Sequence, residues 1–284
     1  MKSDLGEDGI IRLLEASHQK RLAFVILGAG TYFQARNFTV QSYLPHPGVR
    51  LLLISTSTVY GTGYLDHAED EIRDHLADVG QILFVPYALA DRDAYAARAA
   101  ERFARMQIEC VSLHRAGNPK AAVARAQAIF IGGGNTFRLL KHLQDEDLVR
   151  LIRERVLAGM PYMGASAGSN VACPTIRTTN DMPIVEPQTL RALGVFPCQI
   201  NPHYLDPIPG STHMGETREE RLLQYLEENE MPVIGLREGA MLRVRDGVVE
   251  LRGIRGARIF VRGVSPYELA SGSRIEMSNL VSPV

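Results

Sequence analysis

The residues best suited to chemistry lie in a stretch of small residues. The pattern G-x-S-x-G spans residues 164–168 with Ser166 at its centre, after a short apolar run, PYMGA at 161–165, and before a helical pattern. A serine on such a strand-to-helix turn forms a nucleophile elbow, whose bent backbone requires small neighbours. The alternative is a serine that merely fits a tight turn, since turns favour small residues. The strand-turn-helix context favours a nucleophile.

A serine nucleophile needs a base, and the chain has eight histidines. His203 follows an apolar run in QINPHYLD (199–206), at a loop position that can hold an imidazole at a sheet edge, which makes it a candidate for the base. The orienting carboxylate stays open among Asp181, Asp206 and Glu238, all on expected loops. The alternative role for each acid is a helix cap or a surface charge.

A second turn rich in glycine follows the apolar residues AIFIGG (128–133) and contains Gly134 and Asn135. Its N–H groups suit an oxyanion hole completed by Ala167, or a phosphate. The pattern of a P-loop, with Lys after the last glycine, is absent, which disfavours the phosphate.

The rest of the chain supplies the elements that must position these residues. Short apolar runs alternate with helical patterns from residue 49 onward, which predicts an α/β fold with a mostly parallel sheet flanked by helices. Asn118-Pro119 predicts the start of one helix, and Gly159 the end of another. The expected strands are VRLLLIS (49–55), QILFVPY (81–87), IECVSLH (108–114), AIFIGG (128–133) and PYMGA (161–165).

The C-terminal third is expected to add strands to the same sheet, because no linker separates it from the rest. Its strand patterns are VIGLREG (233–239), MLRVRDGVVELRG (241–253), with a hairpin at Asp246-Gly247, and ARIFVRG (257–263). A cluster of proline and glycine at 45–48 predicts a boundary between an N-terminal extension, residues 1–48, and a single catalytic domain, residues 49–284.

The charge and composition of the chain limit the kinds of molecule that we expect it to bind. The net charge is -1 with no basic run, so nucleic acid is not expected, and no apolar run is long enough to cross a membrane. Cys110, Cys173 and Cys198 are widely spaced and form no metal-binding pair, so we expect no metal or other cofactor and a reducing, cytoplasmic location.

Several long motifs in a fixed order carry a family resemblance. IFIGGGNTFRLL, GASAGSNVACPTIRTTNDMPIVEP, FPCQINPHY, GETREER and VIGLREG together resemble peptidase E, the aspartyl dipeptidase family of serine peptidases, whose relatives include cyanophycinase. The resemblance runs over roughly residues 51–261. It implies a fold like that of class I glutamine amidotransferases, with serine in place of their cysteine. It also implies metal-free hydrolysis of dipeptides that begin with aspartate.

Carried onto this chain, the resemblance makes Ser166 the nucleophile and His203 the base, with oxyanion-hole N–H groups from Gly134 and Ala167. Asp181 and Glu238 both match the family, and one of them orients His203 while the other binds the α-ammonium group of the substrate. We favour Glu238 as the orienting acid, because Asp181 follows the serine closely in a loop that can overhang the substrate.

The aspartyl side chain of the substrate requires a cation or several donors. Arg177, Arg218 and Asn135 are candidates, and we favour Arg218 with Asn135, against the alternative of surface ion pairs. The chain departs from the family in residues 1–48, which shorter members lack, and in Gly164-Ala165, where many members carry a bulkier residue. The competing hypotheses are a cyanophycinase-like hydrolase that releases β-Asp-Arg dipeptides and a non-catalytic binding module.

Overall fold

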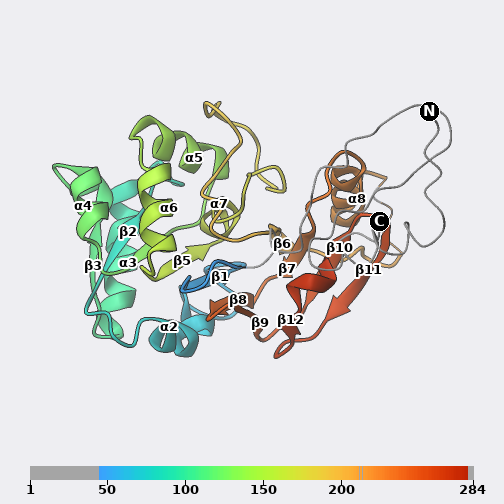
Figure 1. The fold of residues 1–284 in the computed structure, drawn as a ribbon, viewed down its shortest axis with the longest axis horizontal. Coiled ribbons are helices and arrows are strands. Elements are labelled where there is room, and N and C mark those ends of the chain that lie inside the picture. The colour runs from blue at the N-terminus through green and yellow to red at the C-terminus, as the bar shows by residue number, and fades with distance from the viewer. Residues whose placement is uncertain (1–44, 211, 213, 281–284) are drawn as a thin grey trace, which may run out of the picture. The chain divides into compact units, whose positions relative to one another are not determined.

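The computed structural model describes residues 45–210, 212 and 214–280. Most of the expected extension, residues 1–44, therefore lies outside the described residues. The described part contains two β-sheets with helices packed on them (Figure 1).

The larger sheet has eight strands in the order β12-β9-β8-β1-β5-β4-β2-β3. Strands β1, β5, β4, β2 and β3 are parallel, as the sequence predicts, while β8, β9 and β12 add antiparallel pairs at one side. The bounds are β1 (Leu51–Ile54), β2 (Gln81–Val85), β3 (Glu109–Ser112), β4 (Ile129–Ile131), β5 (Tyr162–Ala165), β8 (Ala240–Arg245), β9 (Val248–Gly253) and β12 (Arg274–Ile275).

Helices cover both faces of the parallel strands, which explains why β1, β4 and β5 are buried along their whole length, while the edge strand β3 is only partly buried. Alternate residues of β1 show the division: Leu51 and Leu53 pack in the core under α4 to α7, and Leu52 and Ile54 in the core under α2 and α3. The helices are α2 (Glu69–His75), α3 (Arg92–Arg105), α4 (Pro119–Arg125), α5 (Thr136–Asp145), α6 (Val149–Leu157) and α7 (Ala167–Val171), with 3-10 turns η2 (Asp66–Ala68), η3 (Leu113–Arg115) and η4 (Met277–Leu280).

Local signals in the sequence predict several of these boundaries correctly. The Asn118 side chain accepts the N–H of Ala121 and caps α4 at Pro119, and Gly159, with φ of 99°, follows the end of α6. Asp246 and Gly247 join β8 to β9, both with positive φ, as a two-residue hairpin turn requires.

The prediction of one continuous sheet is wrong for part of the C-terminal third. VIGLREG and ARIFVRG do not extend the larger sheet but form a second sheet of four strands in the order β11-β10-β7-β6. Its strands are β6 (Gln199–Tyr204), β7 (Val233–Arg237), β10 (Ala257–Val261) and β11 (Val264–Leu269). The hydrophobic pattern of these two segments fits a strand in either sheet equally well. Tertiary packing therefore decides which sheet each strand joins.

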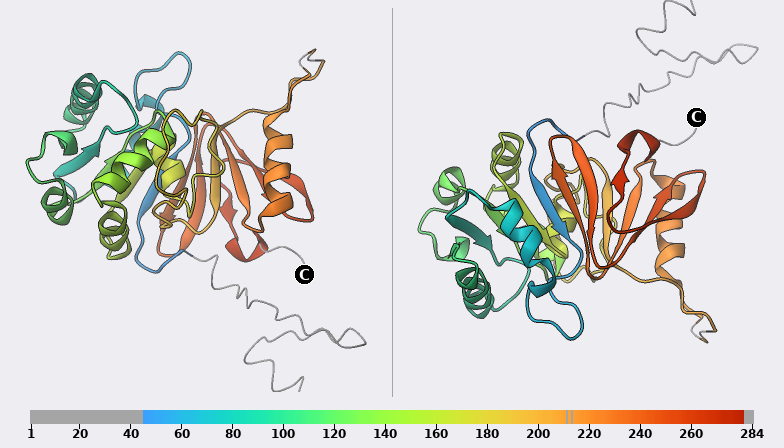
Figure 2. Two further views of the ribbon diagram at one scale, coloured as in Figure 1. Left: turned by 90° about the horizontal axis from the view of Figure 1, so that it is seen from above. Right: turned by 90° about the horizontal axis from the view of Figure 1, so that it is seen from below.

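Strands β6, β7 and β10 of the second sheet are largely buried, while the edge strand β11 is more exposed. Ile234, Leu236 and Ile259 belong to the core shared with the larger sheet, while Val233 and Phe260 pack under α8 (Arg218–Glu228). Figure 2 shows α8, in orange, lying along these strands. Thr217 and Glu220 form a capping box that begins α8.

Candidate active site

Ser166 lies on a strained turn between β5 and α7. Its backbone has φ of 52° and ψ of -110°, a conformation that L-residues rarely adopt. Both glycines of the G-x-S-x-G pattern are required by close packing: a Cβ on Gly164 would lie 2.6 Å from the Gly168 carbonyl, and one on Gly168 would lie 2.0 Å from the Ile131 carbonyl oxygen. The turn is therefore built so that the serine stands at the carboxyl end of β5.

The imidazole of His203 meets the serine from the other sheet. His203 Nε2 lies 2.9 Å from Ser166 Oγ. Contrary to the expected loop, His203 lies within β6, although β6 is indeed an edge strand. The β6–β7 register shifts between Pro202 and Tyr204, and His203 has φ of 53°, so a bulge re-aims its side chain toward the serine.

Glu238 completes a hydrogen-bonded chain with these two residues. It directly follows β7, and its Oε1 lies 2.7 Å from His203 Nδ1. A carboxylate can only accept, so Nδ1 carries the proton and donates a hydrogen bond to Glu238. In this tautomer the unprotonated Nε2 accepts the hydrogen bond of the Ser166 hydroxyl.

The other two acids have different partners. Asp206 forms a bidentate pair with Arg237 at 2.7 and 2.6 Å, and that guanidinium lowers the pKa of Asp206 below its usual range. Asp181 Oδ2 accepts the N–H of Thr136 at 2.8 Å and its hydroxyl at 2.6 Å, at the first residue of α5. Neither acid is hydrogen-bonded to His203.

Asp181 nevertheless retains binding capacity. All of its recorded hydrogen bonds involve Oδ2 or the backbone, and within the described residues Oδ1 has no partner. The Asp181 carboxylate lies at the start of α5, where the helix dipole is positive and stabilises its negative charge.

Arg218 lies near enough to Asp181 for an electrostatic interaction. Burial is the main cause that lowers the pKa of the guanidinium, and Asp181 acts in the opposite sense. Among the described residues, no carboxylate forms an ion pair with Arg218. A half-buried, unpaired guanidinium is available to a carboxylate ligand.

The remaining substrate-binding candidates differ from Arg218. The Asn135 side-chain oxygen Oδ1 accepts the N–H of Arg138, and the side-chain amide donates to the Met182 carbonyl at 2.8 Å, so Asn135 caps α5 and holds the segment after Asp181. Arg177 is exposed, and among the described residues its side chain forms no hydrogen bond or ion pair with another site residue.

The glycine-rich turn lies against the serine. A Cβ on Gly133 would be 3.0 Å from Ser166 Cβ, which places the adjoining Gly134 beside the nucleophile's turn. Gly134 has φ of 132°, outside the range of ordinary residues. Within the described chain, the N–H groups of Gly134 and Ala167 donate to no carbonyl and remain available to a ligand.

Three polar residues that the sequence analysis did not single out hold these parts together. The Asn170 amide of α7 donates to the Ile200 carbonyl at 2.8 Å, and the Asn180 amide donates to the Pro202 carbonyl at 2.6 Å. Buried Ser55, just after β1, accepts the N–H of His203 at 2.9 Å. Ser55 had one local signal, a polar residue directly after a fully apolar strand.

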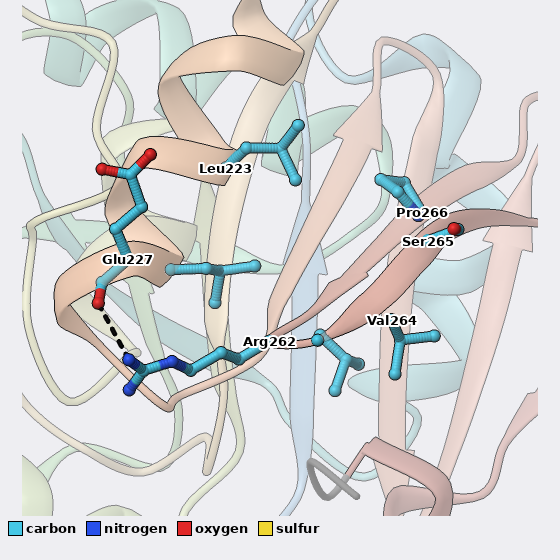
Figure 3. A pocket seen from close by; sticks show the side chains of 9 residues that line it. Leu223, Glu227, Arg262, Val264, Ser265 and Pro266 are labelled. Atoms are coloured by element: carbon cyan, nitrogen blue, oxygen red, sulfur yellow. Dashed lines mark hydrogen bonds between the residues drawn. The ribbon is translucent and has the colours of Figure 1, made fainter.

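A cavity elsewhere contains none of these groups. It has a volume of about 460 Å³ and lies between α8 and the β10–β11 hairpin, where Leu223, Val264 and Pro266 line it (Figure 3). Arg262 closes one side by donating to the Glu227 carbonyl oxygen at 3.0 Å (Figure 3).

Two further observations concern the described chain as a whole. No group of three or more His, Cys, Asp or Glu side chains in residues 45–210, 212 and 214–280 is placed to hold a metal ion. None of the helices in this part has both the length and the apolar character needed to span a lipid bilayer.

A serine on a strained elbow, bonded to an imidazole that is bonded to a carboxylate, is the arrangement used by serine hydrolases. Comparison with known proteins agrees with this class. Peptidase family S51 matches residues 51–252, and the chain belongs to this family.

Several relatives and solved structures that are similar to this chain carry consistent names. Peptidase E of Streptomyces coelicolor is 54% identical over 225 residues, covering 79% of this chain and 93% of the relative. A probable alpha-aspartyl dipeptidase of Drosophila melanogaster is 47% identical over 223 residues, covering 78% and 93%. The crystal structure of a peptidase from an acI-B1 Actinobacterium has a TM-score of 0.60 at 19% identity, covering 82% of this chain and 98% of that one.

A putative peptidase E protein from Listeria monocytogenes has a TM-score of 0.56 at 19% identity, covering 72% of this chain and 98% of that one. At this identity the two solved structures bear on the fold alone. They agree with an α/β fold like that of class I glutamine amidotransferases, as the resemblance implies.

Proposed function

We propose that this protein is a serine exopeptidase that hydrolyses dipeptides with an N-terminal aspartate, through an acyl-enzyme on Ser166. The observation that carries the proposal is the hydrogen-bonded chain from Ser166 to His203 to Glu238, with the serine on its strained turn. Membership of peptidase family S51 and the name alpha-aspartyl dipeptidase of one relative support the substrate class.

In the proposed reaction, Ser166 Oγ attacks the carbonyl carbon of the aspartyl residue while His203 Nε2 takes its proton. The N–H groups of Gly134 and Ala167 donate to the oxyanion that forms. His203 then returns the proton to the departing amine, which leaves the aspartyl group as an ester on Ser166. A water molecule, deprotonated by His203, hydrolyses this ester, while Glu238 holds the tautomer and stabilises the imidazolium in both steps.

Two oppositely charged groups suit the N-terminal aspartyl residue of the substrate. That residue carries an α-ammonium and a β-carboxylate close together. We assign the ammonium to the free Oδ1 of Asp181 and the carboxylate to Arg218, which the structure places within electrostatic range of each other. Asn135 supports this subsite by holding the segment around Asp181 through the Met182 carbonyl.

The alternatives make different predictions about substrates. The relatives carry the names peptidase E and alpha-aspartyl dipeptidase. These names support neither a cyanophycinase-like hydrolase nor a non-catalytic module. The test is the rate of hydrolysis of Asp-Leu, Glu-Leu, Leu-Leu and β-Asp-Arg by the purified protein. We expect Asp-Leu to be hydrolysed with the highest kcat/KM, and a preference for β-Asp-Arg would overturn the assignment.

We also propose a cytoplasmic location. The three cysteines are free, and burial raises the pKa of the Cys173 and Cys198 thiols, so both are held as unreactive thiols in the core. Unpaired cysteines are usual in a reducing compartment. Fractionation of cells that express the protein, with an antibody readout, tests the location.

A further inference from the structure

Ser55 occupies a position that joins the backbones around the proposed base and acid. Its side chain is fully buried. The hydroxyl donates to the Leu236 carbonyl oxygen at 2.7 Å and accepts the N–H of His203 at 2.9 Å. Leu236 lies two residues before Glu238 on β7, so one hydroxyl bridges the strand of the base to the strand of the acid.

The bulge in β6 explains why His203 needs this partner. Pro202 pairs with Leu236 and Tyr204 pairs with Arg237, which leaves His203 without a partner in the β6–β7 ladder. A buried N–H without an acceptor costs stability. Ser55 Oγ satisfies this N–H and so fixes the peptide from which the imidazole projects.

The backbone of the same short segment also anchors the nucleophile and the turn that carries the acid. The Ile54 carbonyl oxygen accepts the N–H of Ser166 at 2.9 Å, and the Ser55 N–H donates to the Ala240 carbonyl at 3.0 Å, two residues after Glu238. Because β1 belongs to the larger sheet and β6 and β7 to the smaller one, the Ser55 side chain links the two sheets at the site.

From these contacts we propose that Ser55 is a positioning residue that sets the His203–Glu238 geometry through the β6 bulge and β7. The proposal rests on the proposed serine peptidase function. Ser55 does not touch the reacting atoms, and its hydroxyl acts only through the backbone groups of His203 and Leu236.

The test is a double-mutant cycle with Ser55→Ala and Glu238→Gln, assayed for kcat and KM on Asp-Leu. We expect Ser55→Ala to lower kcat about 10- to 100-fold with KM within about twofold, because misplacement of a catalytic group by about 1 Å has effects of this size. If Ser55 acts through the His203–Glu238 pair, the double variant is no more than about twofold slower than Glu238→Gln alone. Losses that multiply, or a wild-type kcat for Ser55→Ala, would overturn the proposal.

Thr178→Val is the matched control. Thr178 is also buried, and its hydroxyl also bonds to β6, at the Ile200 carbonyl, but among the described residues it forms no hydrogen bond with His203 or β7. We expect this variant to lose thermal stability while it keeps the wild-type rate of inactivation by a fluorophosphonate, whereas Ser55→Ala reacts about 10-fold or more slowly. Equal inactivation rates for the two variants would count against a positioning role.

Two further variants distinguish failure of the positioning proposal from misfolding and from failure of the proposed function. If Ser55→Ala is unfolded by circular dichroism, Ser55→Cys replaces it in the cycle, because the thiol has similar shape but hydrogen-bonds weakly. Ser166→Ala in the same assay tests the proposed function: retained turnover would overturn both proposals, while an inactive Ser166→Ala with an unaffected Ser55 variant would overturn only the positioning role.

Discussion

His203 Nε2 and Ser166 Oγ lie 2.9 Å apart although they belong to different sheets. Ser166 follows β5 of the eight-stranded sheet, and His203 lies in β6 of the four-stranded sheet. The contact therefore depends on how the two sheets pack and on the bulge that turns the imidazole. We propose that this contact lets Ser166 pass its hydroxyl proton to His203 during attack on the substrate.

We expect Ser166→Ala to leave a folded protein whose kcat on Asp-Leu falls at least about a thousandfold, because alanine fits the turn but cannot attack a carbonyl. Circular dichroism and the peptidase assay measure the two properties. Retained turnover in a folded Ser166→Ala protein would remove Ser166 from the mechanism.

A second serine and histidine provide a control for labelling. Ser112 Oγ lies 2.7 Å from His114 Nδ1, and His114 Nε2 lies 3.2 Å from Asp93 Oδ1. Ser112 has ordinary extended backbone, with φ of -101°, so it is not on an elbow. We expect a fluorophosphonate to modify Ser166 and not Ser112, as peptide mass spectrometry of the labelled protein would show.

Glu238→Gln should lower kcat between about 10- and 10,000-fold with little change in KM. A neutral amide no longer stabilises the imidazolium and also permits the wrong tautomer of His203. Steady-state kinetics on Asp-Leu measure the effect, and Asp206→Asn, which changes an acid bonded to Arg237, is the control. A loss of kcat below about tenfold for Glu238→Gln would show that Glu238 is not the orienting acid.

Asp181→Asn should chiefly raise KM for free dipeptides. The amide retains an oxygen for Thr136 but no longer attracts the α-ammonium group, so we expect an increase of about 10-fold or more. The ratio of kcat/KM for Asp-Leu to that for its N-acetylated form should fall as well. A large loss of kcat with unchanged KM would instead make Asp181 a member of the catalytic chain.

Arg218→Ala should raise KM for Asp-Leu by about 10- to 100-fold and reduce the preference for Asp-Leu over Leu-Leu. The expected cause is loss of the charged hydrogen bonds to the substrate's β-carboxylate. Arg177→Ala is the matched control, because Arg177 is exposed and among the described residues its side chain forms no hydrogen bond or ion pair with a site residue; its kinetics should match the wild type. Equal effects of the two substitutions would argue against a specific role for Arg218.

A chain that begins at Pro45 should hydrolyse Asp-Leu with wild-type kcat/KM. Every residue of the proposed site lies after Val49, and the match to the family begins at residue 51. The shortened chain keeps the His46 carbonyl, which accepts the N–H of buried Val49. Expression, circular dichroism and the peptidase assay test the expectation, and an insoluble or inactive product would show that residues 1–44 are needed.

The sequence by itself determined the local features of this protein. The spacing of small residues around Ser166 predicted the elbow, because Gly164 and Gly168 occupy places where no Cβ fits. Apolar runs predicted the five parallel strands, because the central strands β1, β4 and β5 are buried on both faces and therefore apolar. Asp246-Gly247 predicted the β8–β9 hairpin, because the required positive φ angles are a local property.

Only the tertiary structure decided which distant groups meet. The sequence offers both Asp181 and Glu238 as partners of His203 and favours Glu238 only because Asp181 follows the serine closely. In the structure Asp181 is bonded to Thr136 at the start of α5, and Glu238 follows a strand that pairs with β6. The bulge at His203, the second sheet and the hydroxyl of Ser55 between β6 and β7 were likewise absent from the sequence pattern. Pairing between strands far apart in the chain depends on the packing of the whole core, and hydrophobic periodicity does not encode it.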